Sequence, residues 1–150
     1  MKGWIYFDMD GTLNKFYEVP DWLPKLRAFD PSPYAEAKVM LNMSLLARYL
    51  NQLQKLGWKI GIISWRSKVS NDTYDRQVDE AKYDWLNFHL RSVKFDATHI
   101  IPYGIAKENY KENDNDVLFD DSDPIRVGWG NNAYPPEQIL SVLKALIDEG

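Results

Sequence analysis

The sequence feature that most constrains the fold is residues 3–13, Gly-Trp-Ile-Tyr-Phe-Asp-Met-Asp-Gly-Thr-Leu. The segment begins as a short apolar and aromatic run, which is typical of a buried β-strand. Asp8 and Asp10 follow at once, one residue apart, and Gly11 and Thr12 come next. A buried parallel strand ends at the edge where α/β sheets bind their ligands. Because two like charges this close resist joint ionisation, a cation or a phosphate group at that edge would relieve their repulsion.

The same residues also fit an ordinary turn. Asp-x-Asp-Gly is common in turns, since Asp and Gly are turn-forming residues and Gly adopts positive φ readily. The choice between a turn and a binding site therefore depends on the rest of the chain.

Three further apolar runs have the length and composition of buried strands, at residues 58–64, 97–101 and 116–121. Segments with helical periodicity separate them, and strands that alternate with helices build βαβ units. The sequence therefore predicts one α/β domain over residues 1–150, with a Rossmann-like parallel sheet in three layers and helices on both of its faces. The expected helices lie at 42–56, at 73–90, after Pro136 and, as short ones, after Lys107 and from Asp123.

The predicted helix ends carry recognisable signals. Asn42 suits the N-cap of the first long helix, and Gly57 suits the position just past its end. Asp72 is the expected cap of the second long helix. The inward face of this second helix is expected to carry Val78, Ala81, Trp85, Leu86 and Phe88.

Residues 14–35 interrupt this regular pattern with alternating prolines, aromatic residues and charges. We expect an ordered excursion of loop and short helical turns, because its aromatic side chains need somewhere to bury. A loop of this length inside a compact domain is usually functional. The simpler alternative is that its aromatic residues only pack over the edge of the sheet.

The composition excludes several classes of protein. A hydrophobic fraction of 45% is that of a folded chain, not a disordered one. The net charge of −4 disfavours a surface that coats nucleic acid, and the absence of cysteine excludes disulfides and thiolate chemistry. We see no signal peptide and no apolar run long enough to span a bilayer, so we expect a cytoplasmic protein without a membrane partner.

The carboxyl ends of parallel strands meet at one edge of a sheet, which would bring together polar side chains from distant parts of this chain. Carboxylates are ligands that Mg²⁺ prefers, a serine hydroxyl can donate to a phosphate oxygen, and a lysine supplies fixed positive charge. Such a set predicts metal-assisted phosphoryl transfer to water. Its expected members are Asp8, Asp10, Ser64, Lys107, Asp120 and Asp121.

Two of these acids have expected chemical roles. Asp8 can attack phosphorus as a carboxylate nucleophile and form an acyl-phosphate. Asp10, held away from the metal, can protonate the leaving oxygen and later activate water. Lys94 and Lys111 compete with Lys107 for the cationic role, but Lys107 follows its strand more directly.

These residues resemble the haloacid dehalogenase superfamily of phosphohydrolases. That family has an Asp-x-Asp-x-Thr motif after one strand, a Ser or Thr at the end of a second, a Lys, and an acidic pair at the end of a last strand. The matching segments occur in the family's order over most of the chain. They are Asp8-Met9-Asp10-Gly11-Thr12, Ser64, Lys107 and Asp120-Asp121.

The resemblance implies Mg²⁺ held by Asp8, the backbone carbonyl of Asp10 and Asp120, with Asp121 as a closer or outer ligand. The dehalogenases of the superfamily lack the second acid of the first motif. Because Asp10 is present, phosphate chemistry is favoured over the cleavage of carbon–halogen bonds.

The substrate is expected to be a small phosphorylated molecule. The gaps between the motifs are too short for a large cap domain, so the chain resembles a capless or minimally capped member with 14–35 near the site. The segment after Leu13 is similar to small nucleotidases of the superfamily, which indicates a 5′-nucleotidase with Phe16 or Tyr17 stacked on the base; core packing is the alternative for both rings. Arg66 can reach the phosphate or stay a solvated loop residue.

Two other classes of protein remain open at this point. A receiver domain of signalling proteins also gathers acids, a hydroxyl residue and a lysine at strand ends, but in a different order along the chain. A catalytically inactive binding domain of the same fold is the second alternative.

Overall fold

The central β-sheet is parallel throughout, and its order agrees with the predicted βαβ pattern. A computed structural model describes residues 2–150. The strands lie in the order β3-β2-β1-β4-β5, so the strand that carries the first motif is the central one. Their bounds are β1 Gly3–Phe7, β2 Trp58–Trp65, β3 Ala97–Ile101, β4 Val117–Phe119 and β5 Ala133–Tyr134.

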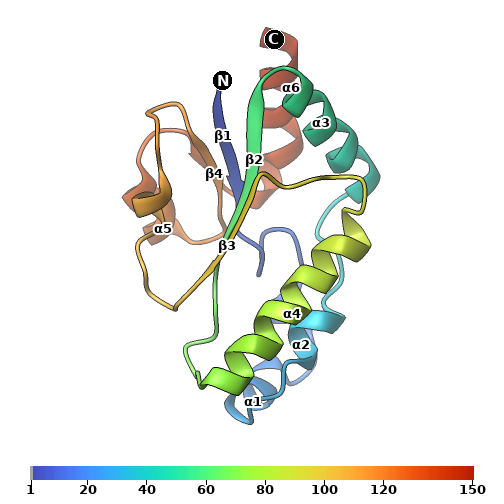
Figure 1. Ribbon diagram of the computed structural model, residues 1–150, viewed down its shortest axis with the longest axis vertical. Coiled ribbons are helices and arrows are strands. Elements are labelled where there is room, and N and C mark those ends of the chain that lie inside the picture. The colour runs from blue at the N-terminus through green and yellow to red at the C-terminus, as the bar shows by residue number, and fades with distance from the viewer. Residues whose placement is uncertain (1) are drawn as a thin grey trace.

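Helices connect these strands and fall into two groups (Figure 1). One group covers the sheet, and the other lies beyond the carboxyl ends of the strands, where α1 and α2 sit beside α4. The α-helices are α1 Trp22–Arg27, α2 Ser32–Glu36, α3 Met43–Lys55, α4 Asp72–His89, α5 Asp123–Trp129 and α6 Ile139–Glu149. Single 3₁₀ turns are η1 Phe16–Glu18, η2 Lys107–Tyr110 and η3 Pro136–Gln138.

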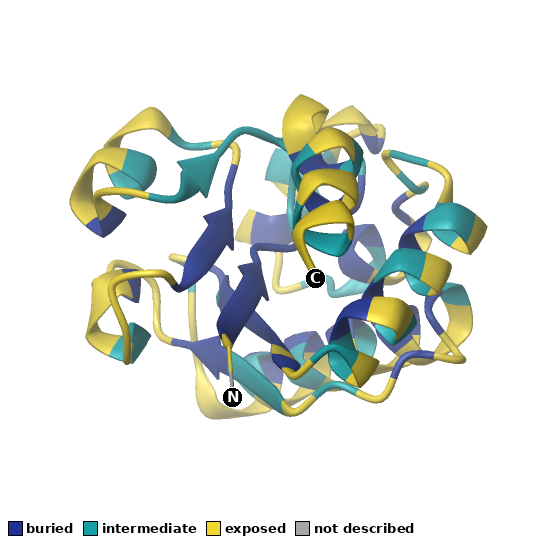
Figure 2. Cartoon of the chain, turned by 90° about the horizontal axis from the view of Figure 1, so that it is seen from above, coloured by how far each residue is buried: buried dark blue, intermediate teal, exposed yellow. Residues whose placement is uncertain are grey.

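The sheet is buried on both faces, as expected for a parallel sheet. On one face Ile5, Phe7 and Ile62 pack against side chains of α3, α4 and α6. On the other face Tyr6 and Leu118 pack with Trp129 of α5. Figure 2 shows β1, β4 and most of β2 buried at the centre, the edge strands β3 and β5 partly exposed, and helices around them with exposed outer faces. This arrangement confirms the predicted three layers.

The helix ends confirm some of the capping signals and correct another. The Asn42 side chain accepts from Leu45 N at 3.0 Å, and Gly57 has a φ of +102° just past α3. The cap of α4 is Asn71, whose side chain accepts from Tyr74 N at 2.8 Å, so the expectation of Asp72 was wrong by one residue.

The inward face of α4 also differs from the prediction at one position. Phe88 is 70% exposed, because it lies one residue outside the stripe that carries Trp85 and Leu86. The stripe instead includes Tyr74 and Lys82, both of which are buried.

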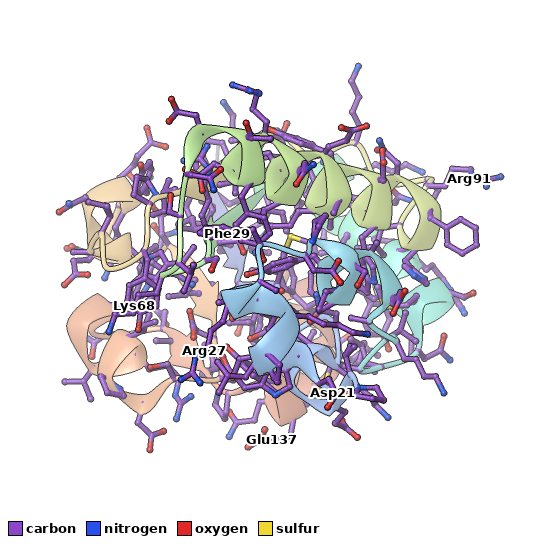
Figure 3. The ribbon with its side chains drawn as sticks, turned by 90° about the horizontal axis from the view of Figure 1, so that it is seen from below. Asp21, Arg27, Phe29, Lys68, Arg91 and Glu137 are labelled. Carbon is purple, nitrogen blue, oxygen red and sulfur yellow. The ribbon has the colours of Figure 1, made fainter. Side chains whose placement is uncertain are left out.

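The segment after β1 forms η1, α1 and α2. Its aromatic residues form a cluster of their own, in which Phe16 and Tyr34 pack against Tyr74 and Val78 of α4. Figure 3 views this end of the molecule and shows α1 in front, with α4 along one side.

Among residues 2–150, no helix combines the length and hydropathy that crossing a bilayer requires.

Candidate active site

Asp8 lies directly after β1, and its side chain is held at both oxygens. Thr12 Oγ1 donates to Oδ2 at 2.9 Å, and Lys107 Nζ donates to Oδ1 at 2.9 Å. The backbone N–H of Asp8 donates to Phe119 O at 2.9 Å, which joins the end of β1 to the end of β4. These bonds fix the rotation of a carboxylate that is only 7% exposed.

Lys107 bridges the ends of β1 and β4. Its ammonium also donates to Asp120 Oδ2 at 2.7 Å, so one buried cation holds two buried carboxylates. Burial alone would lower the pKa of Lys107, but the charges of Asp8 and Asp120 and their hydrogen bonds raise it above its ordinary value. Lys107 therefore stays charged at neutral pH.

Three carboxylates converge next to Lys107. Asp8, Asp120 and Asp121 each offer an oxygen atom, and these atoms lie within 4.8 Å of one another. Burial, followed by repulsion from Asp8, raises the pKa of Asp120 to about 6. Loss of hydration and repulsion from Asp8 and Asp120 raise the pKa of Asp121 to about 7. Such mutual repulsion is what a divalent cation would relieve, and three hard oxygen donors fit Mg²⁺.

Asp10 lies close by but belongs to a different set of contacts. Its Oδ1 accepts from Asn14 Nδ2 at 3.2 Å, and its Oδ2 accepts from Lys82 Nζ at 3.0 Å. The Asn14 side chain is itself fixed, because its Oδ1 accepts from Phe16 N at 3.1 Å. The Asp10 side chain thus lies outside the group of three carboxylates that could share an ion.

Ser64 belongs to the same set of contacts as Asp10, because Lys82 donates to both side chains. It is fully buried near the end of β2, and its Oγ accepts from Lys82 Nζ at 2.6 Å. Because Lys82 uses the oxygen as an acceptor, the hydroxyl proton of Ser64 remains to be donated elsewhere.

A pocket of about 430 Å³ opens over these residues. Its aromatic lining includes Tyr17 and Trp22 from the segment after β1, and Trp65 and Tyr103 from the ends of β2 and β3. Tyr17 and Tyr103 are both about half exposed, at 52% and 53%. Its polar lining consists of Asp8, Asp10, Arg66, Ser67, Lys68, Lys107, Asp120, Asp121 and Ser122.

Known proteins match this chain by structure and not by sequence. No protein-family model matches, and no curated protein matches. D,D-heptose 1,7-bisphosphate phosphatase from Burkholderia thailandensis is 14% identical, with a TM-score of 0.54 over 99% of this chain and 97% of that one. The B. bronchiseptica enzyme of the same name, complexed with magnesium and phosphate, is 14% identical, with a TM-score of 0.58 over 99% of both chains. The chain has the fold of these two phosphatases.

The fold brings most of the predicted site residues to one place. The pocket is lined by Asp8, Asp10, Lys107, Asp120 and Asp121. Ser64 is buried outside this lining, and Lys82 joins it to Asp10 by hydrogen bonds to both side chains. The two competing lysines lie elsewhere. Lys94 is exposed beside Gln54, and Lys111 Nζ donates to Trp129 O at 3.0 Å.

Two residues that were predicted to contact the substrate, Arg66 and Phe16, are already engaged in contacts within the protein. Arg66 lines the pocket, but its guanidinium forms a two-pronged ion pair with Asp79 at 2.8 and 2.9 Å. Phe16 is only 2% exposed and packs on Tyr34, which leaves Tyr17 as the more accessible ring.

Sequence reasoning missed Lys82 and Asn14. Lys82 stands on the apolar stripe of α4, four residues after Val78, and a lysine at an inward position was the available signal. Asn14 had no comparable signal, because an Asn four residues after Asp10 is equally typical of a turn.

Proposed function

We propose that the protein is a Mg²⁺-dependent phosphomonoester hydrolase that works through an aspartyl-phosphate. The observation that carries this proposal is the position of Asp8 on the floor of the pocket. Its carboxylate is oriented by Thr12 and Lys107 and lies among acids that could share a cation. A fixed carboxylate beside fixed positive charge is the arrangement that in-line attack on phosphorus requires.

The residues present fit a bound magnesium ion. Asp8, Asp120 and Asp121 would hold it, and the resemblance to the haloacid dehalogenase superfamily adds the backbone carbonyl of Asp10. When bound, Mg²⁺ supplies charge neutralisation at the phosphoryl oxygens. The magnesium and phosphate found with the B. bronchiseptica phosphatase support this choice of ion.

The reaction can be followed through the protein's own residues. A carboxylate oxygen of Asp8 attacks phosphorus and the P–O bond to the leaving group breaks, while protonated Asp10 gives its proton to the leaving oxygen. Asp10, now ionised, takes a proton from water as that water attacks the phosphorus of the aspartyl-phosphate. The P–O bond to Asp8 breaks, which releases inorganic phosphate and restores both acids.

Two further residues would bind the transferred phosphoryl group. Lys107, whose raised pKa keeps it charged, offsets the negative charge of the phosphoryl oxygens. Ser64 can donate its hydroxyl proton to one of those oxygens, because its acceptor capacity is used by Lys82.

Nucleoside 5′-monophosphates are the substrate class that we favour. A planar base suits a pocket lined by several aromatic rings. The centroids of the Trp65 and Tyr103 rings lie 5.0 Å apart, and Tyr17 contacts Trp22 edge-on with ring centroids 5.1 Å apart. Sugar phosphates are the second candidate, because the two phosphatases with the same fold are named for a heptose bisphosphate.

A panel of phosphate esters tests the activity and the substrate class together. Nucleoside 5′-monophosphates, hexose phosphates and p-nitrophenyl phosphate are each assayed with Mg²⁺ and with EDTA. We expect phosphate release only with Mg²⁺, and the largest kcat/KM for a nucleotide. Absence of turnover on every ester with Mg²⁺ would reject the hydrolase and favour an inactive binding domain. Slow accumulation of phosphoprotein without turnover would favour a receiver-like domain.

A further inference from the structure

Lys82 is a buried lysine that the proposed reaction steps do not use. It comes from the middle of α4, its side chain is 1% exposed, and it is not part of the pocket lining, although its partner Asp10 is. Its ammonium also lies 5.0 Å from the centre of the Tyr34 ring. A lysine in such a place is costly to bury, so its contacts need an explanation.

The ammonium of Lys82 has three N–H donors, and the structure gives it three acceptor atoms. It donates to Asp10 Oδ2 at 3.0 Å, to Ser64 Oγ at 2.6 Å and to the backbone oxygen of Trp65 at 3.1 Å. Two of these acceptors are the expected acid/base and a phosphate-binding hydroxyl. The third lies on the backbone directly after Ser64.

Stability alone does not account for a lysine at this position. Its neighbours on the inward stripe of α4 are Val78, Trp85 and Leu86, all buried and apolar. Replacing a buried ion pair by a well-packed apolar side chain is often neutral or stabilising. An apolar residue at 82 would therefore complete the stripe, but it would leave the Asp10 and Ser64 contacts unmade.

We propose that Lys82 is a positioning residue that holds Asp10 and Ser64 in a fixed relation to each other; this inference rests on the proposed hydrolase function. Asn14 donates to one carboxylate oxygen of Asp10 and Lys82 donates to the other, which fixes the plane of this carboxylate. The structure thus assigns a separate lysine to each acid of the first motif, Lys107 to Asp8 and Lys82 to Asp10.

The proposal predicts a loss that depends on the leaving group. An acid that protonates the leaving oxygen matters most when that oxygen leaves poorly. Phenyl phosphate and 2,4-dinitrophenyl phosphate form a matched pair, because both are aryl esters and only the second leaves readily without a proton. The measured quantity is kcat/KM with Mg²⁺, which reports the step that forms the phosphoenzyme.

We expect Lys82→Met to lower kcat/KM by about 100-fold for phenyl phosphate and by less than about 10-fold for the dinitrophenyl ester. Arg76→Met is the matched control, because it removes one positive charge from an exposed position of the same helix. That control should leave the ratio of the two kcat/KM values unchanged. The ratio does not depend on how much of a sample is folded, since both esters are measured on the same preparation.

A double-mutant cycle tests whether Lys82 acts through Asp10. In an Asp10→Asn background the added Lys82→Met change should reduce kcat/KM for phenyl phosphate by no more than about twofold, because the two residues act as a unit. Lys82→Arg, which keeps the charge and the donors, should recover part of the lost ratio.

Equal losses for both esters, or an undiminished loss in the Asp10→Asn background, would overturn the positioning role. Failure of the proposed hydrolase function would give a different result. The wild-type protein would then release no phosphate from either ester with Mg²⁺, and no ratio could be measured.

Discussion

Asp8 and Asp10 are separated by one residue but have different surroundings. Asp8 is held by Thr12 and Lys107 next to Asp120, and its group of carboxylates can share a cation. Asp10 is held by Asn14 and Lys82 outside that group. Different partners let two neighbouring carboxylates take different roles, since the environment of a carboxylate decides whether it attacks or transfers a proton.

The proposed role of Asp8 as the nucleophile predicts a large loss of activity when its carboxylate is replaced. Asp8→Asn keeps the size of the side chain but replaces a nucleophilic oxygen with an amide, so kcat should fall by at least about 1,000-fold. The assay is phosphate release from p-nitrophenyl phosphate with Mg²⁺, and circular dichroism checks that the variant is folded. Asp123→Asn, an exposed acid at the start of α5, is the control. Full activity of Asp8→Asn would exclude Asp8 as the nucleophile.

Asp10→Asn should behave differently from Asp8→Asn. It leaves the proposed nucleophile in place but removes the proposed acid/base, so turnover should fall by about 100- to 10,000-fold. Phosphoenzyme formed from 2,4-dinitrophenyl phosphate should then accumulate, because that ester needs little help in the first step while hydrolysis still needs a base. Intact-protein mass spectrometry after a brief reaction would show one added phosphoryl group. Unchanged kinetics would contradict the acid/base role.

The turn after β1 is the element that places both acids. Its Gly11 has a φ of +81°, and a Cβ there would meet the Asp121 carboxylate and lie 3.0 Å from the Tyr17 ring. The backbone of the turn is closed by Gly11 N, which donates to Asn14 O at 2.9 Å. The turn therefore needs a residue without a side chain both for its conformation and for the room that Asp121 occupies.

Gly11→Ala and Gly104→Ala separate these two requirements. Gly104 also has a positive φ, +89°, but nothing lies within 4 Å of the position of its Cβ. Gly104→Ala should lower the free energy of unfolding by about 1–2 kcal/mol, the cost of the left-handed backbone alone. Gly11→Ala should cost more and should also raise the Mg²⁺ concentration needed for activity, because Asp121 must move.

Urea unfolding gives the free energy of unfolding of each variant, and activity measured over a range of MgCl₂ concentrations gives the Mg²⁺ requirement of each. If the two variants lose equal stability and keep the same Mg²⁺ requirement, the contact between this turn and Asp121 has no consequence.

The sequence was informative about elements wherever a pattern repeated. Apolar runs and helical spacing were enough to predict the strands and the two long helices. Because parallel strands end at the same edge of a sheet, the sequence also predicted that the residues of the four motifs would lie near one another. The cap of α4 was placed one residue late because Asn71 and Asp72 are both good caps, and only the backbone decides between them. Lys82 was missed because helical periodicity predicts an apolar residue at an inward position. Only the tertiary structure shows that its ammonium contacts Asp10 and Ser64.

At the scale of the whole molecule, we expect the acids at the carboxyl edge to make stability depend on pH and on a bound metal ion. Their charges come from the ends of two strands and from the loops that follow, so the fold itself forces them together. In the unfolded chain these carboxyls separate and regain ordinary pKa values near 3.8. Folding without a cation therefore favours their protonated forms.

The sign of the pH effect follows from the raised pKa values of Asp120 and Asp121, about 6 and about 7. The folded state binds these protons more tightly than the unfolded state, so their contribution to stability is full below about pH 4 and is lost as the pH rises toward 7. His89 and His99, whose pKa values are lowered by burial, act in the opposite direction over part of the same range. A single melting curve against pH would mix the two effects.

The difference between melting temperatures with Mg²⁺ and with EDTA isolates the acids, because the histidine contributions cancel at each pH. Mg²⁺ at ten times its Kd adds about 1.4 kcal/mol, which is about 3–6 °C for a domain of this size. We expect a shift of that order near about pH 7.5 and a smaller one near about pH 5.5, where protons compete with the metal for Asp120 and Asp121. NaCl at equal ionic strength is the control for screening. An equal or larger Mg²⁺ shift at the lower pH would mean that ionisation of these two acids does not control metal binding, and the cation would then have to be held elsewhere.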